Sequence, residues 1–264
     1  MANRVAFITG GSRGIGKAVG LKLASEGWDI VVAAKTTEPQ PNLEGTIFTA
    51  AEEMERHGVR VLPVRCDVTD MASVEQARDA TLKEFGRVDA VINNAGALWW
   101  LPMTETPMKR FDLMMAVNAK GAFAVTQAFL PQMIEQKSGH VIVMSPPIRT
   151  DILGGKIGYF ISKFGMTLIA HGIPQEYGQY NIHGTALWPR TLVESQATIN
   201  HGMGERSQWR KPEIIADATW EILEHPELCD GKAVIDEAFL REVGYTDFSV
   251  YDCVEGGTPL VISD

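Results

Sequence analysis

Cysteine is scarce in this 264-residue chain. Cys66, Cys229 and Cys253 are odd in number and far apart, and none forms a CxxC pair or lies near a pair of histidines. This pattern argues against a disulfide framework and against a structural zinc site. We therefore expect free thiols in a reducing compartment and no bound metal.

Positive charge and long apolar runs are also scarce. The chain has 24 Lys and Arg against 33 Asp and Glu, a net charge of −9, which does not suit a protein that neutralises nucleic-acid phosphates. No stretch reaches the roughly 20 apolar residues of a membrane span. The N-terminus also lacks the apolar segment of a signal peptide. We expect a soluble cytoplasmic protein that binds neither nucleic acid nor membranes.

Short β-branched runs alternate with amphipathic segments from one end of the chain to the other. Strands separated by helices in this way predict right-handed βαβ units and a parallel sheet covered on both faces. We expect one α/β domain over residues 1–264, with a doubly wound seven-stranded parallel sheet. The expected strands are residues 4–9, 29–34, 59–64, 90–93, 140–144, 181–188 and 233–236.

The longest segments without clear periodicity follow expected strands. They are residues 35–44, 97–107, 146–156 and 189–211. Because ligands of open parallel sheets bind beyond the carboxyl ends of the strands, we expect a functional site among these segments.

The segment TGGSRGIG, residues 9–16, follows the first expected strand and begins the first expected helix. Glycines at Gly10, Gly14 and Gly16 permit a tight turn, close backbone approach and close helix packing. The amide groups at the helix N-terminus would then face a pyrophosphate. In this strand-turn-helix position, the motif predicts a dinucleotide site.

The end of the second strand favours NADP over NAD, which stays possible. No carboxylate stands there to bind both ribose hydroxyls, whereas Lys35 and Arg13 could bind an added 2′-phosphate. The alternative is that both cations are solvated surface residues. Asp67, after the third strand, could accept from the adenine amino group or cap a helix.

Five motifs occur in a characteristic order: TGGSRGIG, NNAG at residues 93–96, Asn118, Ser145 and YFISK at residues 159–163. Over nearly its whole length the chain thereby resembles the short-chain dehydrogenase/reductase family, which implies a Rossmann fold. The segments MSPPI, ALWPRT and IIADA are most similar to the hydroxysteroid dehydrogenase-like protein 2 group. Related bacterial enzymes act on terpenoid alcohols such as citronellol.

The resemblance implies an alcohol:NAD(P)⁺ oxidoreductase and assigns its site residues. The catalytic set would be Asn118, Ser145, Tyr159 and Lys163. The cofactor contacts would be Gly10, Ser12, Arg13, Gly14, Ile15, Gly16, Lys35, Asp67, Val68, Asn94, Ala95, Gly96, Tyr159, Lys163, Pro189 and Thr191.

Tyr159 and Lys163 are one helical turn apart and share a face. An alcohol that loses hydride must also lose a proton, so the site needs a base with a pKa near the working pH. A neighbouring ammonium lowers the pKa of a phenol, normally about 10, by one to three units. We hypothesise that Tyr159 is the acid/base, that Lys163 lowers its pKa and holds the nicotinamide ribose, that Ser145 binds the substrate oxygen, and that Asn118 holds a water. Without these roles, the pair would be a half-buried Tyr and a Lys laid over apolar surface.

Two departures from the family pattern affect the expected site. Arg190 stands where the family usually has Gly after Pro189, which places a bulky cation beside the expected nicotinamide site. Ser145 is followed by Pro146 and Pro147, so the loop after it should be stiff.

Apolar residues cluster in the segments expected at the same edge of the sheet: Leu98, Trp99, Trp100, Leu101, Ile148, Leu153, Trp188, Leu192 and Val193. If they converge, they form a pocket for a fatty, terpenoid or steroid-like alcohol, ketone or aldehyde. Packing in the core or between subunits is the alternative.

Two other functions are compatible with a dinucleotide site. A catalytically silent regulatory or scaffold protein could bind the cofactor, but it would not need a phenol-ammonium pair. A sugar-nucleotide epimerase uses a similar pair, but roughly fifty residues after Lys211 are too few for its substrate domain. From the resemblance we expect a homodimer or homotetramer, with the helices through Asn118 and Tyr159 as contact faces.

Overall fold

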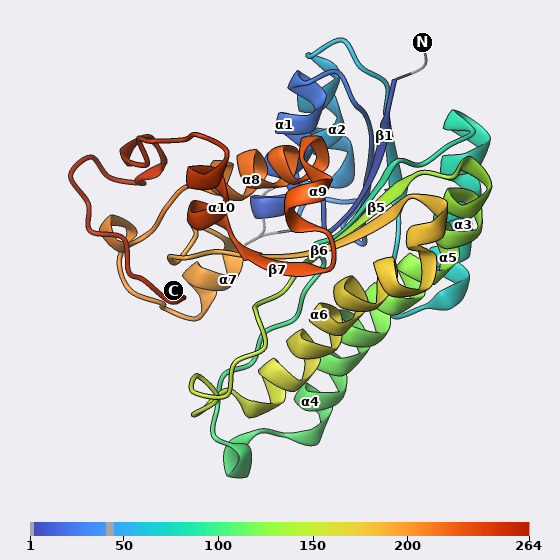
Figure 1. The fold of residues 1–264 in the computed structure, drawn as a ribbon. Coiled ribbons are helices and arrows are strands. Elements are labelled where there is room, and N and C mark those ends of the chain that lie inside the picture. The colour runs from blue at the N-terminus through green and yellow to red at the C-terminus, as the bar shows by residue number, and fades with distance from the viewer. Residues whose placement is uncertain (1–2, 41–44, 264) are drawn as a thin grey trace.

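A computed structural model describes residues 3–40 and 45–263. It contains one sheet of seven strands in the order β3-β2-β1-β4-β5-β6-β7, and every neighbouring pair is parallel (Figure 1). This order confirms the predicted doubly wound sheet. The strands are β1 Val5–Thr9, β2 Asp29–Ala34, β3 Val61–Arg65, β4 Ala90–Asn93, β5 Gly139–Met144, β6 Ile182–Trp188 and β7 Lys232–Ile235.

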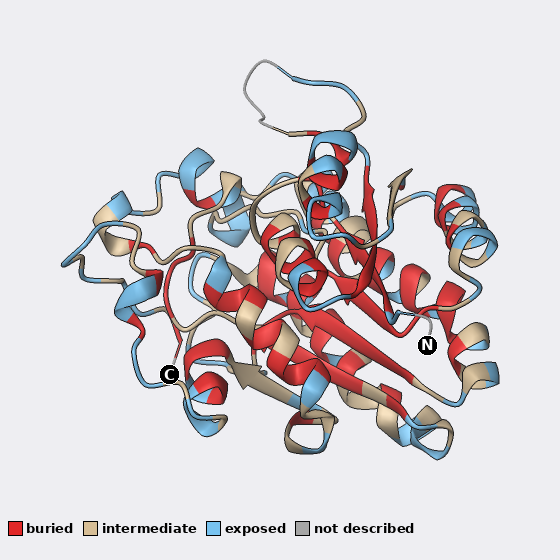
Figure 2. Cartoon of the chain, turned by 90° about the horizontal axis from the view of Figure 1, so that it is seen from above, coloured by how far each residue is buried: buried red, intermediate tan, exposed pale blue. Residues whose placement is uncertain are grey.

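Helices cover both faces of the sheet because successive strand residues point to opposite sides. In β1, Ala6 and Ile8 pack into one apolar cluster with α1 (Gly14–Ser25), α2 (Ile47–Glu55) and α8 (Glu213–Glu224). Val5 and Phe7 pack into a second cluster with α3 (Met71–Phe85), α5 (Gly121–Gln136) and α6 (Ile157–Tyr177). Figure 2 shows the buried strands between these helices.

Local signals explain where several helices begin and end. Thr46 and Thr49 form a capping box at the start of α2. The Asp70 side chain accepts from Ala72 N–H at the start of α3, and Gly86 ends that helix in the left-handed region at φ 70°. The helix over 71–85 therefore has a sequence signal at each end.

The expected long helix through Asn118 is divided into three parts. It consists of α4 (Met108–Met114), a π-helical turn (Met115–Lys120) and α5. By length and composition, residues 108–136 could cross a membrane, which the sequence analysis did not recognise. Half of the most apolar window is buried in the protein. Val125 and Phe129 of this segment belong to the apolar cluster on one face of the sheet.

The segments after β6 gather beyond the carboxyl ends of the strands. They include α7 (Gln196–Asn200) and, after β7, α10 (Asp236–Glu242), whereas α9 (Pro226–Cys229) leads into the amino end of β7. The end of the chain returns to the segment after β6, where Val261 forms an antiparallel bridge with Thr191. Several parts of the chain thus meet at the edge where the site was expected.

Candidate active site

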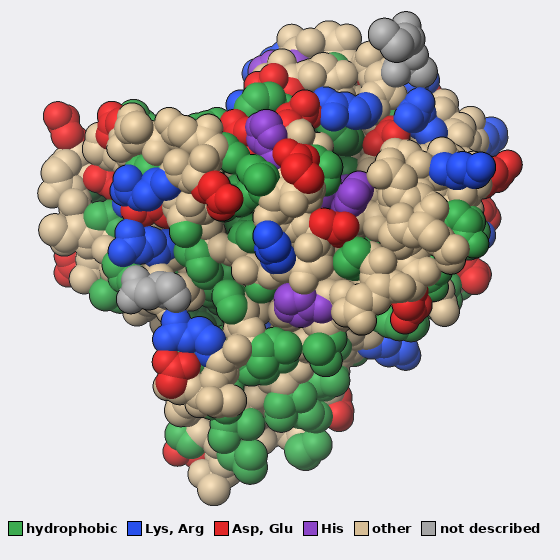
Figure 3. Space-filling model, in the orientation of Figure 1, with side chains coloured by type: hydrophobic (Ala, Val, Ile, Leu, Met, Phe, Trp, Pro, Cys, Tyr) green, Lys and Arg blue, Asp and Glu red, His purple; other side chains and the backbone are tan. Residues whose placement is uncertain are grey.

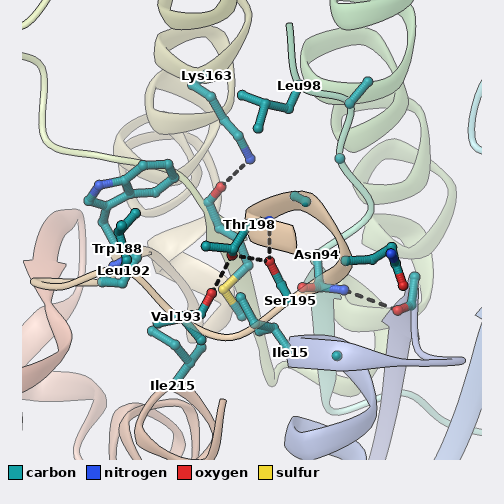
Figure 4. A pocket seen from close by; sticks show the side chains of 18 of the residues that line it. Ile15, Asn94, Leu98, Lys163, Trp188, Leu192, Val193, Ser195, Thr198 and Ile215 are labelled. Carbon is teal, nitrogen blue, oxygen red and sulfur yellow. Dashed lines mark hydrogen bonds between the residues drawn. The ribbon is translucent and has the colours of Figure 1, made fainter. Parts of the chain in front are cut away.

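A cavity of about 340 Å³ lies at the carboxyl edge of the sheet. Its walls come from the β1–α1 turn, the ends of β4, β5 and β6, the first turns of α6, the α7 region and the end of the chain (Figure 4). The sequence-predicted site residues among its lining are Gly10, Arg13, Gly14, Ile15, Asn94, Ala95, Gly96, Tyr159, Lys163 and Pro189.

The glycine turn is held tightly against the end of β4. Gly10 and Gly14 have φ of 66° and 52°, which glycine adopts without strain. The Asn94 side chain donates to the carbonyls of Thr9 (3.0 Å) and Gly10 (3.2 Å). A Cβ at Gly16 would lie 2.5 Å from Asn94 Nδ2, so Gly16 acts in packing and lies outside the cavity lining.

The turn fits a dinucleotide pyrophosphate. Arg13 precedes α1 in an extended conformation, and its side chain does not cap the amide groups of the first helical turn. Such uncapped amides, together with the positive end of the helix dipole, bind phosphate groups. Gly14 and Ile15 bring this turn into the cavity, as the sequence predicted.

The cations expected near an added 2′-phosphate already have protein partners. Lys35 Nζ lies 3.4 Å from Asp67, and Arg13 donates to the Gly45 carbonyl at 2.9 Å. Asp67 also accepts from Thr69 N–H at 3.0 Å, and these bonds hold the pKa of its carboxyl low despite partial burial. Four of the predicted contacts, Lys35, Asp67, Val68 and Ser12, lie outside the described lining of the cavity.

Thr191 also lies outside that lining, and its contact with the cofactor stays a prediction. Its side chain is 2% exposed, and its backbone pairs with Val261. The bridge to the end of the chain accounts for this burial.

Tyr159 and Lys163 both line the cavity and lie on one face of α6, as predicted. They are only 7% and 5% exposed, and Lys163 Nζ lies 5.9 Å from the centre of the Tyr159 ring. The ammonium donates to the Met144 carbonyl at 2.6 Å (Figure 4). Tyr159 and Lys163 are therefore neighbours in the cavity wall. The Lys163 ammonium lies beside the Tyr159 ring and is hydrogen-bonded to the Met144 carbonyl.

The pKa values differ from the hypothesis made from the sequence. Burial raises the pKa of the Tyr159 phenol above its ordinary value, whereas we expected Lys163 to lower it. Burial also lowers the pKa of Lys163, to about 8. Desolvation disfavours both charged forms, so in this structure the phenol is protonated at neutral pH.

Ser145 follows β5 directly, but its side chain lies in the interior. It is 0% exposed and accepts a hydrogen bond from the Thr167 hydroxyl on α6 at 3.0 Å. The described lining of the cavity includes its neighbour Met144 and omits Ser145. In this bond the Ser145 hydroxyl is the acceptor, so its own proton is available for another bond. The contact with the substrate oxygen stays a prediction.

Asn118 lies in the π-helical turn and is fully buried. Its side chain accepts from Ala97 N–H (2.7 Å) and donates to the Ala97 carbonyl (2.9 Å) and to Ser162 (2.9 Å). The Oδ1 atom can accept a second hydrogen bond, so the expected role of holding a water stays a prediction. In this structure Asn118 positions Ala97, which lines the cavity beside Gly96.

The expected apolar pocket forms only in part. Leu98, Trp100, Trp188, Leu192 and Val193 line the cavity, and the Trp100 ring packs edge-on against Tyr159 at 5.9 Å. The remaining predicted pocket residues lie outside the described lining: Ile148 is 51% exposed, Trp99 and Leu153 pack beside Tyr159 and Phe160, and Leu101 lies in the same loop as Trp99.

The Arg190 cation lies beside α10. Its guanidinium pairs with Glu237 at the start of α10, at 2.7 Å. Pro189 lines the cavity, whereas Arg190 lies outside the described lining. A carboxylate on α10 thus explains how Arg is accommodated at this position.

Sequence reasoning missed the residues that the α7 region and the end of the chain contribute: Ser195, Gln196, Ala197, Thr198, Met203 and Ile262. Ser195 caps α7 by accepting from Thr198 N–H at 3.2 Å, and a Cβ at Gly14 would lie 4.0 Å from it. A Ser followed three residues later by Thr in the segment 189–211 was a usable signal for a helix start. Ile262 had no local signal, because only the tertiary fold brings it here.

Comparisons with known proteins agree with this geometry. Residues 4–202 match the family model described as short chain dehydrogenase. The chain is 41% identical over 263 residues to hydroxysteroid dehydrogenase-like protein 2 from Homo sapiens, an alignment that covers 98% of this chain and 62% of that protein. The chain thus spans less than two thirds of the length of this relative.

Two solved structures have the same fold. The crystal structure of a short chain dehydrogenase from Mycobacterium thermoresistibile is 40% identical, with a TM-score of 0.92 and coverage of 100% and 96% of the two chains. An alcohol dehydrogenase from Thermococcus sibiricus, complexed with 5-hydroxy-NADP, is 25% identical, with a TM-score of 0.76 and coverage of 88% and 95%.

Proposed function

Since this chain belongs to the short-chain dehydrogenase family, we propose that it transfers hydride between NADP(H) and an apolar alcohol, ketone or aldehyde, with Tyr159 as the acid/base. One observation carries the proposal. A single cavity is lined by the glycine turn, by Tyr159 and Lys163, and by apolar side chains. It therefore brings together groups suited to a dinucleotide, a proton donor and an apolar substrate.

The roles of the protein groups follow from their positions. Amides of the β1–α1 turn would hold the pyrophosphate, and the Lys163 ammonium would hold the nicotinamide ribose. When bound, the nicotinamide supplies or accepts the hydride. In carbonyl reduction, the protonated Tyr159 hydroxyl donates its proton to the substrate oxygen as the carbon accepts hydride. In alcohol oxidation, the same oxygen must take up a proton.

Burial raises the pKa of Tyr159, so the phenol is protonated at neutral pH in the protein without cofactor. A protonated phenol is the form that a general acid needs, whereas alcohol oxidation needs a group that accepts a proton. A positive nicotinamide ring near the phenol would favour the phenolate and would oppose the effect of burial. The oxidised cofactor would therefore assist the proton transfer of alcohol oxidation, and the same hydroxyl serves both directions.

The substrate class rests on the lining of the cavity. Leu98, Trp100, Trp188 and Leu192 form an apolar surface around the reacting groups. A cavity of about 340 Å³ is at the small end of the range for ligand sites. The cofactor would occupy part of this volume, so a linear fatty or terpenoid compound fits the remaining space better than a steroid does.

NADP(H) is the proposed cofactor, with NAD(H) as the second candidate. Strand β2 ends at Ala34, and Lys35 follows it without a carboxylate for the ribose hydroxyls. Lys35 now pairs with Asp67, but its side chain is 62% exposed and can turn toward a 2′-phosphate. An exposed ion pair of this kind contributes little energy, so exchanging it for a phosphate costs little.

The experiment is a cofactor-linked screen. The purified protein is tested for reduction of linear and terpenoid ketones and aldehydes with NADPH and with NADH, and for oxidation of the matching alcohols. We expect turnover of apolar compounds, with a higher kcat/KM for NADPH. Tight NADPH binding without turnover of any compound would refute the proposed reaction and would favour a regulatory dinucleotide-binding protein.

We also propose that the chain associates with itself through α5 and α6. A groove between them is lined by Phe123 and Leu168, which are 56% and 59% exposed. Figure 3 shows hydrophobic side chains gathered on the lower part of the molecule, over α4 and α6. Contiguous exposed apolar patches are common at subunit interfaces. Members of the short-chain dehydrogenase family generally form oligomers. A homodimer or homotetramer would cover it.

A further inference from the structure

The last residues of the chain form part of the cavity wall. We define the C-terminal strap as residues 257–263. Ile262 of this strap lines the cavity, together with Trp188, Leu192 and Met203. These neighbours are apolar, so Ile262 belongs to the part of the wall that would face the hydrocarbon portion of a substrate.

Backbone hydrogen bonds attach the strap to two segments that lie before it in the chain. Thr258 and Leu260 donate to Ser207 and Gln208, each at 2.9 Å, and Leu192 N–H donates to the Leu260 carbonyl at 3.0 Å. A Cβ at Gly257 would lie 2.5 Å from the Ser207 carbonyl oxygen, so glycine permits the close approach there. The strap therefore lies in a defined register.

Arg190 is the point at which the strap meets the cavity. Its carbonyl accepts from the amides of Ile262 (2.7 Å) and Ser263 (3.1 Å). Its own amide donates to Asp236 at 2.8 Å, and its side chain pairs with Glu237. The Arg190 backbone is thus held by α10 on one side and holds the strap on the other.

Glu237 strengthens this attachment because it also pairs with Arg210 and Arg241. The Glu237 side chain is only 3% exposed and that of Arg210 11%, so this pair is shielded from solvent, whereas the Arg190 and Arg241 side chains are 38% and 54% exposed. The Val193 backbone pairs with that of Arg210, which extends the same support along the cavity wall. A rigid wall of this kind can discriminate between substrates by size, which a mobile tail could not do.

We propose that the C-terminal strap is a fixed wall of the substrate cavity and that Ile262 determines how long an apolar substrate the cavity accepts. The inference rests on the proposed function, which it extends to substrate length. Val261 provides a matched control, because it is the neighbouring residue, 46% exposed, and lies outside the described lining of the cavity.

The test compares Ile262→Ala, Ile262→Phe and Val261→Ala with the original protein. The measured quantity is the ratio of kcat/KM for 2-decanone to that for 2-hexanone, with NADPH. Each methylene buried contributes a factor of about 4. We expect Ile262→Ala to raise the ratio about 5- to 10-fold, Ile262→Phe to lower it by a similar factor, and Val261→Ala to leave it within about 2-fold. A ratio unchanged in both Ile262 variants would overturn the proposal.

Failure of the proposed function would be recognised separately, as absence of turnover by the original protein. In that case, the cavity wall is tested by binding of the neutral apolar dye N-phenyl-1-naphthylamine, detected by its fluorescence. Opposite shifts of its Kd in Ile262→Ala and Ile262→Phe, by about 3-fold or more and absent in Val261→Ala, would support the strap as a cavity wall. Equal Kd values in all variants would overturn it. Every variant keeps the hydrogen bond from the Ile262 N–H to the Arg190 carbonyl, so the strap keeps its attachment.

Discussion

The side chain of Asn118 binds both backbone groups of Ala97: Oδ1 accepts from the N–H at 2.7 Å, and Nδ2 donates to the carbonyl at 2.9 Å. This relationship joins the π-helical turn to the segment after β4, which forms one wall of the cavity. Single π-helical turns are frequent at functional sites. Here the turn places a fully buried amide where it can orient a cavity wall.

Replacing Asn118 with Leu should therefore affect both stability and activity. The variant keeps a similar side-chain volume but leaves two Ala97 backbone groups without partners, each of which costs about 1–3 kcal/mol. We expect the free energy of unfolding, measured with urea, to fall by about 2–4 kcal/mol and kcat/KM to fall at least 10-fold. The exposed Asn200→Leu is the control and should change stability by less than about 0.5 kcal/mol. Equal stabilities of the two variants would show that the Ala97 bonds contribute little.

Tyr159→Phe should abolish turnover and preserve cofactor binding. It removes only the hydroxyl, and general acid/base catalysis contributes a factor of about 10² to 10⁴. We expect kcat to fall by about 10³-fold, while the Kd of NADPH, measured by fluorescence, stays within about 3-fold. Tyr180→Phe, outside the described cavity lining, serves as the control. Turnover of Tyr159→Phe close to that of the original protein would refute the role of the phenol.

Ser145→Ala distinguishes the observed structure from the role assigned by family resemblance. Because the hydroxyl is fully buried against Thr167, we expect kcat/KM to stay within about 5-fold. Stability should fall by about 1 kcal/mol through loss of that hydrogen bond. Both values are available from steady-state kinetics and urea unfolding. A 100-fold loss of kcat/KM at unchanged KM would mean that the hydroxyl turns toward the substrate oxygen when the site is filled.

His140 should make the stability depend on pH. Its ring lies in the core, where Nε2 is 2.9 Å from Thr185 Oγ1 and the His183 ring is 5.6 Å away. Burial, with a smaller effect of His183, lowers the pKa of His140 from 6.5 to about 3. As pH falls, the His140 ring takes up a proton in the unfolded chain at a higher pH than in the folded protein. The contribution of the neutral ring to stability is therefore complete above pH 6.5 and is lost as pH falls toward 3.

When pH falls from about 7.5 to 5, His140 should lower the free energy of unfolding by about 2 kcal/mol. His140→Gln, which can still donate to Thr185, should remove this part of the pH dependence in urea unfolding. The exposed His57→Gln should retain it. The same slope in both variants would assign the pH dependence to other groups.

Leu168→Glu tests self-association. Leu168 is 59% exposed and lines the groove between α5 and α6, so a charge there would be buried if a second copy covered it. We expect the variant to be monomeric in sedimentation or light scattering, while the original protein is a dimer or tetramer. Val250 is also apolar and exposed but does not line this groove. The control variant Val250→Glu should therefore leave the assembly unchanged. An unchanged mass of Leu168→Glu would place the interface elsewhere.

Much of the architecture was predictable, because it depends on patterns that are local in the chain. Alternation of β-branched strands and amphipathic helices was sufficient for a parallel sheet with two covered faces. The glycine turn was also predictable, because Gly10 and Gly14 take the left-handed conformations that their position requires. The residues of the apolar wall were predicted only in part. Trp99 follows β4 as Trp100 does, and Ile148 follows β5, but neither Trp99 nor Ile148 belongs to the described cavity lining.

The amino-acid sequence by itself determined that Tyr159 and Lys163 share a helical face next to a dinucleotide turn, because helix periodicity and glycine conformation act within a few residues. Tertiary structure alone decided how acidic that phenol is, where the Ser145 hydroxyl points, and that Ile262 completes the cavity. Each of these outcomes depends on burial or on partners far apart in the chain. Solvent exclusion raises the pKa of Tyr159, Thr167 binds Ser145, and Arg190 holds the strap against the wall. Burial and long-range pairing arise only when the whole chain has packed, so no short stretch of sequence contains them.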